Sequence, residues 1–129
     1  MTIIDHLSVG VPAIEEAARF YDGLMETLGL KNLAQTEGFA AYGAAAPAFL
    51  IMKPENGKDA GAGNGIHIAF SAPGKTAVDA FHAFATRNGG ACAGAPGPRP
   101  GYPKADVYTA FVRDPYGNKL EAIFNGFAS

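Results

Sequence analysis

The sequence lacks the features of disulfide-bonded, membrane-spanning and nucleic-acid-binding proteins. Its 129 residues include a single cysteine, Cys92, and no tryptophan. One cysteine excludes an internal disulfide and a cysteine-rich zinc site. The chain has no run of 18 apolar residues, which argues against a membrane-spanning helix. Ten Lys and Arg against twelve Asp and Glu give a net charge of −2. These cations are scattered and form no basic patch, so nucleic acid is not an expected partner.

The N-terminal stretch MTIIDHLSVG also lacks the basic start and apolar core of a secretory signal. We therefore expect a cytoplasmic protein, which the single cysteine also favours. The chain is rich in turn formers, with 17 glycines and 9 prolines, and 48% of its residues are hydrophobic. This composition predicts one domain with an ordinary core and many short strands.

A pattern of one strand, one helix and three strands begins near the N-terminus. Residues 3–11 alternate as a strand does, and Pro12 then opens a helix with one apolar stripe. Gly29 suits the end of that helix, where a left-handed residue is favoured. The next segments predict three short strands, at residues 31–36, 39–43 and 48–53.

The same pattern is repeated after a polar, glycine-rich linker. A strand at 65–72 precedes a helix opened by Pro73 and ended by Gly89 and Gly90. Short strands are expected near 91–94, 107–113 and 119–124. A shift of 61 residues superposes four pairs of identical residues: His6 on His67, Pro12 on Pro73, Phe20 on Phe81, and Gly29 on Gly90. We predict an α+β fold of two βαβββ modules, residues 1–56 and 65–129, joined by linker 57–64 into one compact domain.

Three polar residues lie in strands that otherwise look buried: His6, His67 and Glu121. Glu121 follows the turn DPYGN and sits inside the apolar strand LEAIF. An unpaired buried carboxylate costs several kcal/mol, so Glu121 needs either a partner or solvent. Taken singly, each of the three is more often structural or exposed. Two imidazoles and one carboxylate on matching faces of repeated strands form a facial triad that suits a divalent metal.

Three segments, DHLSVGVP, GIHIAFSAP and DPYGNKLEAI, resemble the vicinal oxygen chelate superfamily. This superfamily includes glyoxalase I, fosfomycin-resistance enzymes, extradiol dioxygenases and bleomycin-binding proteins. The resemblance implies a curved, cupped mixed sheet with helices on its outer face. It also implies metal ligands at His6, His67 and Glu121. Such ligands suit Fe, Mn, Zn, Ni and Co alike.

The chain departs from the glyoxalase I pattern at one position. Members of that type carry a ligating Glu on the last strand of the first module, and here that strand reads AFLIMK. We expect a glyoxalase- or dioxygenase-like metalloenzyme, acting as a lyase, dioxygenase or transferase, that chelates vicinal oxygens of a small substrate. The alternative is a metal-free, drug-binding protein of the bleomycin-resistance type. The resemblance further implies a homodimer. In one arrangement His6 of one subunit joins His67 and Glu121 of the other; in the other, which the glycine-rich linker also permits, the three ligands come from one chain.

The loop 95–104, APGPRPGYPK, is inserted before the penultimate strand. One hypothesis is that Arg99 and Tyr102 of this loop, with Tyr108 behind it, bind an anionic substrate. The other is that the loop only covers a sheet edge and uses proline to block strand pairing.

Overall fold

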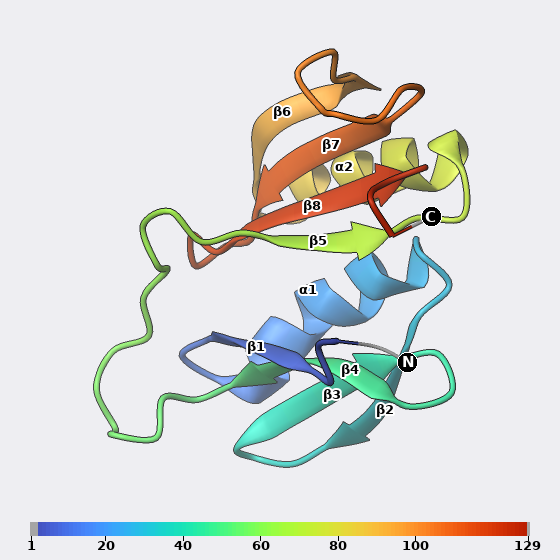
Figure 1. Ribbon diagram of the computed structural model, residues 1–129. Helices are drawn as coiled ribbons and strands as arrows, with labels where there is room; N and C mark the ends of the chain where they lie inside the picture. Colours follow the sequence, from blue (N-terminus) through green and yellow to red (C-terminus); the bar gives the residue numbers. More distant parts are fainter. Residues whose placement is uncertain (1–2, 129) are drawn as a thin grey trace.

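The computed structural model describes residues 3–128 and contains two βαβββ modules (Figure 1). The first module consists of β1 (Leu7–Gly10), α1 (Ile14–Glu26), β2 (Lys31–Gln35), β3 (Phe39–Gly43) and β4 (Pro47–Met52). The second consists of β5 (Ile68–Ser71), α2 (Lys75–Arg87), β6 (Ala91–Pro98), β7 (Tyr108–Arg113) and β8 (Lys119–Phe124). The predicted α+β class and module order are confirmed. Residues 1, 2 and 129 of the predicted modules lie outside the described residues.

Each module forms its own four-stranded mixed sheet. The strand orders are β1-β4-β3-β2 and β5-β8-β7-β6. The pairs β1–β4 and β5–β8 are parallel, and the other pairs are antiparallel. β1 and β5 therefore each lie at the edge of a sheet, with one side unpaired by any strand of residues 3–128. Neither helix in the described part of the chain is long and apolar enough to cross a membrane.

The first strand of each module is shorter than predicted. β1 begins at Leu7 and β5 at Ile68, so His6 and His67 immediately precede their strands. In the first module the parallel ladder begins with Leu7 opposite Phe49. Pro47, two residues earlier on β4, has no N–H to extend that ladder. In the second module Gly65 has a φ of 91°, which turns the chain just before β5.

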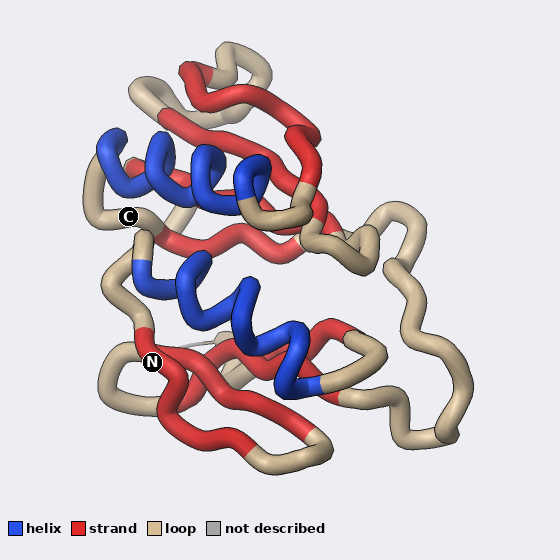
Figure 2. Tube along the Cα trace, turned by 180° about the vertical axis from the view of Figure 1, so that it is seen from behind, coloured by secondary structure: helices blue, strands red, loops and turns tan. Residues whose placement is uncertain are grey.

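The two helices pack on one side of the molecule, as the view from behind shows (Figure 2). Their buried stripes join the sheets into one core, in which Phe49 and Phe70 pack edge to face at 5.0 Å between ring centroids. Phe20 of α1 and Phe84 of α2 lie 5.9 Å apart. Gly23 permits this approach, because a Cβ there would lie 2.2 Å from Phe84 Cζ. Among the residues described, no helix lies on the opposite face of either sheet (Figure 1).

The DPYGN turn links the modules through a buried carboxylate. Asp114 is 3% exposed and accepts hydrogen bonds from the Tyr116 and Asn118 N–H groups and from the Asn118 amide. The Tyr21 hydroxyl, on α1 of the other module, donates to it as well. The Asn118 amide also lies 3.0 Å from the Gly10 carbonyl of β1. Burial, reinforced by the charge of Asp114, raises the pKa of Tyr21 well above its usual value, so this hydroxyl remains a donor.

Replacing Tyr21 with Phe tests the contribution of this link to stability. The change leaves a buried carboxylate short of one donor, and we expect the free energy of unfolding to fall by about 1.5–3 kcal/mol. Urea unfolding followed by circular dichroism measures the change. The matched control is Tyr108→Phe, which removes a hydroxyl bound to Asp79 at the surface. Equal stability of Tyr21→Phe and the parent would contradict the proposed stabilisation.

Candidate functional site

Glu121 lies in the middle of β8, is 2% exposed and is fully supplied with partners. One carboxylate oxygen, Oε1, lies 3.0 Å from His67 Nε2. The other, Oε2, accepts hydrogen bonds from the Tyr102 hydroxyl at 2.7 Å and the Thr109 hydroxyl at 2.5 Å. The carboxylate is therefore buried but not unpaired, which removes most of the cost of its burial. These contacts define a Glu121 cluster: Glu121, His67, Tyr102 and Thr109.

The strand register places this cluster on the face of the second sheet away from α2. Phe111 is paired with Glu121 across β7 and β8, and Ala69 is paired with it across β5 and β8. Paired residues share one face of a sheet. The small Ala69 leaves space beside the carboxylate. The ring of Phe111 lies 5.7 Å from that of His67. This face is therefore open at Ala69 and bounded by an aromatic ring.

His6 does not join the cluster within one chain. Its side chain is 59% exposed, and its Nδ1 lies 2.6 Å from Asp5 Oδ1. Residues 3–128 contain no group of three His, Cys, Asp or Glu side chains placed to hold a metal ion. The single chain thus brings together two of the three predicted ligands, His67 and Glu121. Two ligands are one fewer than a facial triad requires.

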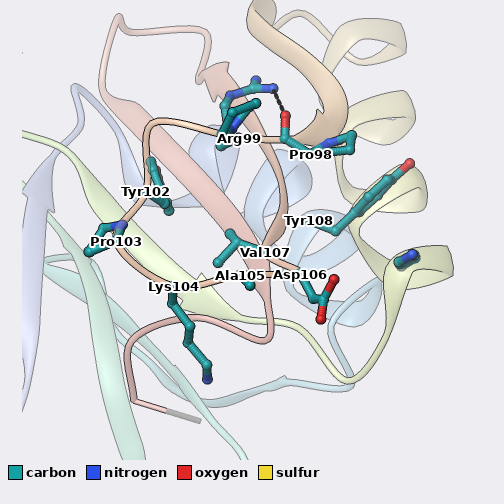
Figure 3. A pocket seen from close by; sticks show the side chains of 11 residues that line it. Pro98, Arg99, Tyr102, Pro103, Lys104, Ala105, Asp106, Val107 and Tyr108 are labelled. Carbon is teal, nitrogen blue, oxygen red and sulfur yellow. Dashed lines mark hydrogen bonds between the residues drawn. The ribbon is translucent and has the colours of Figure 1, made fainter.

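Arg99, Tyr102 and Tyr108, the predicted substrate-binding residues, line one cavity of about 470 Å³ (Figure 3). Tyr102 connects this cavity to Glu121. Burial, together with the hydrogen bond to Glu121 and its charge, raises the pKa of Tyr102 to about 12, so its hydroxyl is a donor at neutral pH. The Arg99 guanidinium donates to the Pro98 and Ala95 carbonyls. Tyr108 donates instead to Asp79 of α2, on the helix side of the sheet.

The loop that carries Tyr102 is shorter than predicted and is attached to the C-terminal segment. β6 continues to Pro98, because an edge strand tolerates proline, and the loop begins at Arg99. The Lys104 ammonium donates to the Gly126 carbonyl at 2.9 Å. The rings of Tyr102 and Phe127 lie 5.3 Å apart. The loop therefore reaches over the sheet to Glu121, beyond the edge strand it leaves.

Thr109 is the member of the cluster that the sequence analysis missed. It is fully buried, and its strand, read as VYTAFVR, looks like ordinary core. The sequence signal that was available is the alternation of side chains along a strand, which puts Thr109 and Phe111 on the same face. Nothing in the sequence indicates that this face meets Glu121, since the pairing of β7 with β8 determines the contact.

Thr109→Val tests whether the hydroxyl supports the buried carboxylate. The change keeps the side-chain shape and removes one donor to Glu121, and we expect the free energy of unfolding to fall by about 1–3 kcal/mol. Urea unfolding of the metal-free protein measures it. Thr109→Ser keeps the donor and should lose less stability than Thr109→Val. The reverse order would show that packing of the Thr109 methyl group, and not the hydrogen bond, stabilises the site.

Comparison with known proteins agrees with this architecture over nearly the whole chain. Residues 3–122 match the family model described as Glyoxalase/Bleomycin resistance protein/Dioxygenase superfamily. The chain is similar to the crystal structure of a glyoxalase/bleomycin resistance protein from Albidiferax ferrireducens T118, with 36% identity and a TM-score of 0.86. That alignment covers 97% of this chain and 100% of the other. A glyoxalase-related enzyme from Fulvimarina pelagi shares the fold, with 17% identity, a TM-score of 0.74, and coverage of 97% and 89%. No match was found among curated proteins. The chain belongs to the Glyoxalase/Bleomycin resistance protein/Dioxygenase superfamily.

Proposed function

We propose that this protein is a metalloenzyme that binds two neighbouring oxygens of a small substrate on a divalent metal. The metal ligands are His67 and Glu121 of one chain and His6 of a second copy. The observation that carries the proposal is the buried carboxylate of Glu121 beside the His67 imidazole, 3.0 Å away on an open sheet face. Imidazole and carboxylate donors suit Fe, Mn, Zn, Ni and Co.

Features around the two histidines support the second copy. The outer edges of β1 and β5 are unpaired within the described part of the chain, and each histidine immediately precedes one of these strands. Large apolar side chains flank both positions. Ile4, two residues before His6, is 60% exposed, and Ile66, directly before His67, is 64% exposed. Unpaired edges and exposed apolar residues are features that an interface covers. In the proposed homodimer, β1 of one chain lies along β5 of the other.

The residues of the chain have separate roles in this proposal. A bound metal supplies Lewis-acid polarisation of the substrate oxygens. Thr109 holds Glu121 in place. The Tyr102 hydroxyl, protonated at neutral pH, donates its one proton to Glu121 and would turn it toward negative charge on a bound substrate. Arg99 and Tyr108 complete the wall of the adjoining cavity. β4 carries no carboxylate. The strand therefore lacks the Glu that would transfer a proton in a glutathione-dependent glyoxalase.

One observation favours a second candidate, a metal-free protein that sequesters a drug-like molecule. A cavity of about 510 Å³ lies between the modules, and its walls include the aromatic residues Tyr42, Phe49 and Phe70. Apolar cavities of this size accommodate organic ligands. Metal content discriminates between the two candidates, because the drug-binding function requires no metal.

Metal analysis of protein purified without chelator or nickel resin is the first test. We expect about one equivalent of divalent metal per chain, and loss of that metal in Glu121→Gln, which removes a charged ligand. Glu37→Gln, at an exposed acid of the first module, is the matched control and should keep the metal. Native protein that contains no metal and takes up none on titration would overturn the proposal and favour the drug-binding candidate.

Mixed dimers test whether the site is shared between chains. His6→Ala and Glu121→Gln should each lose the metal. A dimer with one chain of each variant, isolated with two histidine-free tags, has one site with both changes and one with neither. It should therefore regain about half of the parent metal content per chain. The control is a mixed dimer of His67→Ala and Glu121→Gln, in which every site lacks one ligand. Recovery in neither mixture would show that the three ligands do not come from two chains as proposed.

A further inference from the structure

A cavity of about 440 Å³ adjoins the Glu121 cluster on the side opposite the Tyr102 loop. Its walls are residues 62–66, His67 and two cations, Arg113 and Lys119. It shares no wall residue with the cavity that Arg99, Tyr102 and Tyr108 line. A ligand in it would contact His67 directly, without entering the space beneath the loop.

The two cations lie directly opposite each other, with Arg113 of β7 paired with Lys119 of β8. Like charges in this position destabilise a sheet. Neither forms an ion pair with a carboxylate in the part of the chain described, residues 3–128. One Arg113 nitrogen, Nη1, donates to the Gly117 carbonyl at 2.8 Å, which fixes the guanidinium and leaves its other donors for a ligand. The pair is unfavourable by itself and would become favourable beside an anion.

A third cation reaches the same face. The Lys119 ammonium lies 5.2 Å from the centre of the Phe111 ring, and the Arg99 guanidinium lies 5.5 Å from it. Gly94 makes room for Arg99, because a Cβ at that position would lie 2.8 Å from its Nη2 atom. His67 contacts the same ring. Two cationic side chains thus lie near one aromatic residue of the open face.

Acidic residues do little to offset this charge. Residues 65–129 contain six Lys or Arg and four Asp or Glu. Two of these acids, Asp114 and Glu121, are buried and engaged in hydrogen bonds within the fold. The surface of the second module is therefore positive although the whole chain is negative. A cleft lined by charges of one sign concentrates ions of the opposite sign.

We propose that the cavity beside His67 is an oxyanion subsite, in which Arg113 and Lys119 bind a carboxylate, phosphate or phosphonate group. If the subsite serves the proposed function, on which this part of the proposal rests, the substrate carries an anionic group next to its metal-binding oxygens. The subsite itself requires no metal, since its donors are an ammonium, a guanidinium and the amide of Asn64. This assignment selects small oxyanionic molecules from the substrates that the fold could accept.

Titration of metal-stripped full-length protein with inorganic phosphate, and separately with acetate, tests the subsite. Backbone amide NMR shifts report the position of binding, and we expect saturable shifts centred on residues 62–67, Arg113 and Lys119 for at least one of the two ions. The ion that binds with the lower Kd identifies the anionic group that the subsite prefers. Lys119→Gln and Arg113→Gln should each weaken binding by about tenfold, because each loses a charge-assisted hydrogen bond.

Two controls exclude general charge effects and misfolding. Lys31→Gln removes one positive charge from an exposed position on β2 of the other module and should leave binding unchanged. Lys119→Arg keeps the charge and should retain binding. Saturation by neither ion, or equal weakening in Lys31→Gln, would overturn the subsite. The proposed function is tested by a different measurement, the metal content. Phosphate binding by a protein that takes up no metal would therefore support the anion subsite and contradict the proposed metalloenzyme.

Discussion

The buried carboxylate of Asp114 is the contact on which the geometry of the molecule depends. It ends β7, orders the turn into β8 and accepts the Tyr21 hydroxyl from the other module. Through Asn118 the same turn reaches the backbone of β1 at Gly10. The strand that follows His6 and the strand that carries Glu121 are therefore connected through one hydrogen-bond network. Such a network requires complete pairing, because an unsatisfied group in it would be costly.

The repeated pattern of strands and helices could be predicted because it depends on local spacing. Apolar periodicity, helix-opening prolines and helix-ending glycines recur in both modules, and the structure has both modules in the predicted order. Glu121 was also recognisable, since an acid in an apolar strand needs a partner. The partners themselves depend on strand register and loop path, which no local pattern specifies. Thr109 and the reach of Tyr102 to Glu121 were therefore visible only in the structure.

The position of His6 illustrates a different limit of sequence reasoning. Its repeat relation to His67 indicates equivalent places in two modules, and the structure has both residues just before their edge strands. Equivalence in a repeat does not imply proximity, because two copies of a module can be joined in more than one arrangement. Within this chain the modules meet through their helices and through the rings of Phe49 and Phe70. The faces that carry the two histidines remain open to another chain.

Charge and hydrogen bonding divide the second sheet into two zones. Around Glu121, neutral hydroxyl donors and one imidazole surround a buried negative charge, and the imidazole and the carboxylate are the groups that would hold a metal cation. Two paired positions further along the same strands, Arg113 and Lys119 present two positive charges opposite each other on the same face. A substrate with a metal-binding end and an anionic end would match both zones at once. Two such contacts at fixed spacing would orient the substrate as well as bind it, because rotation about either contact would break the other.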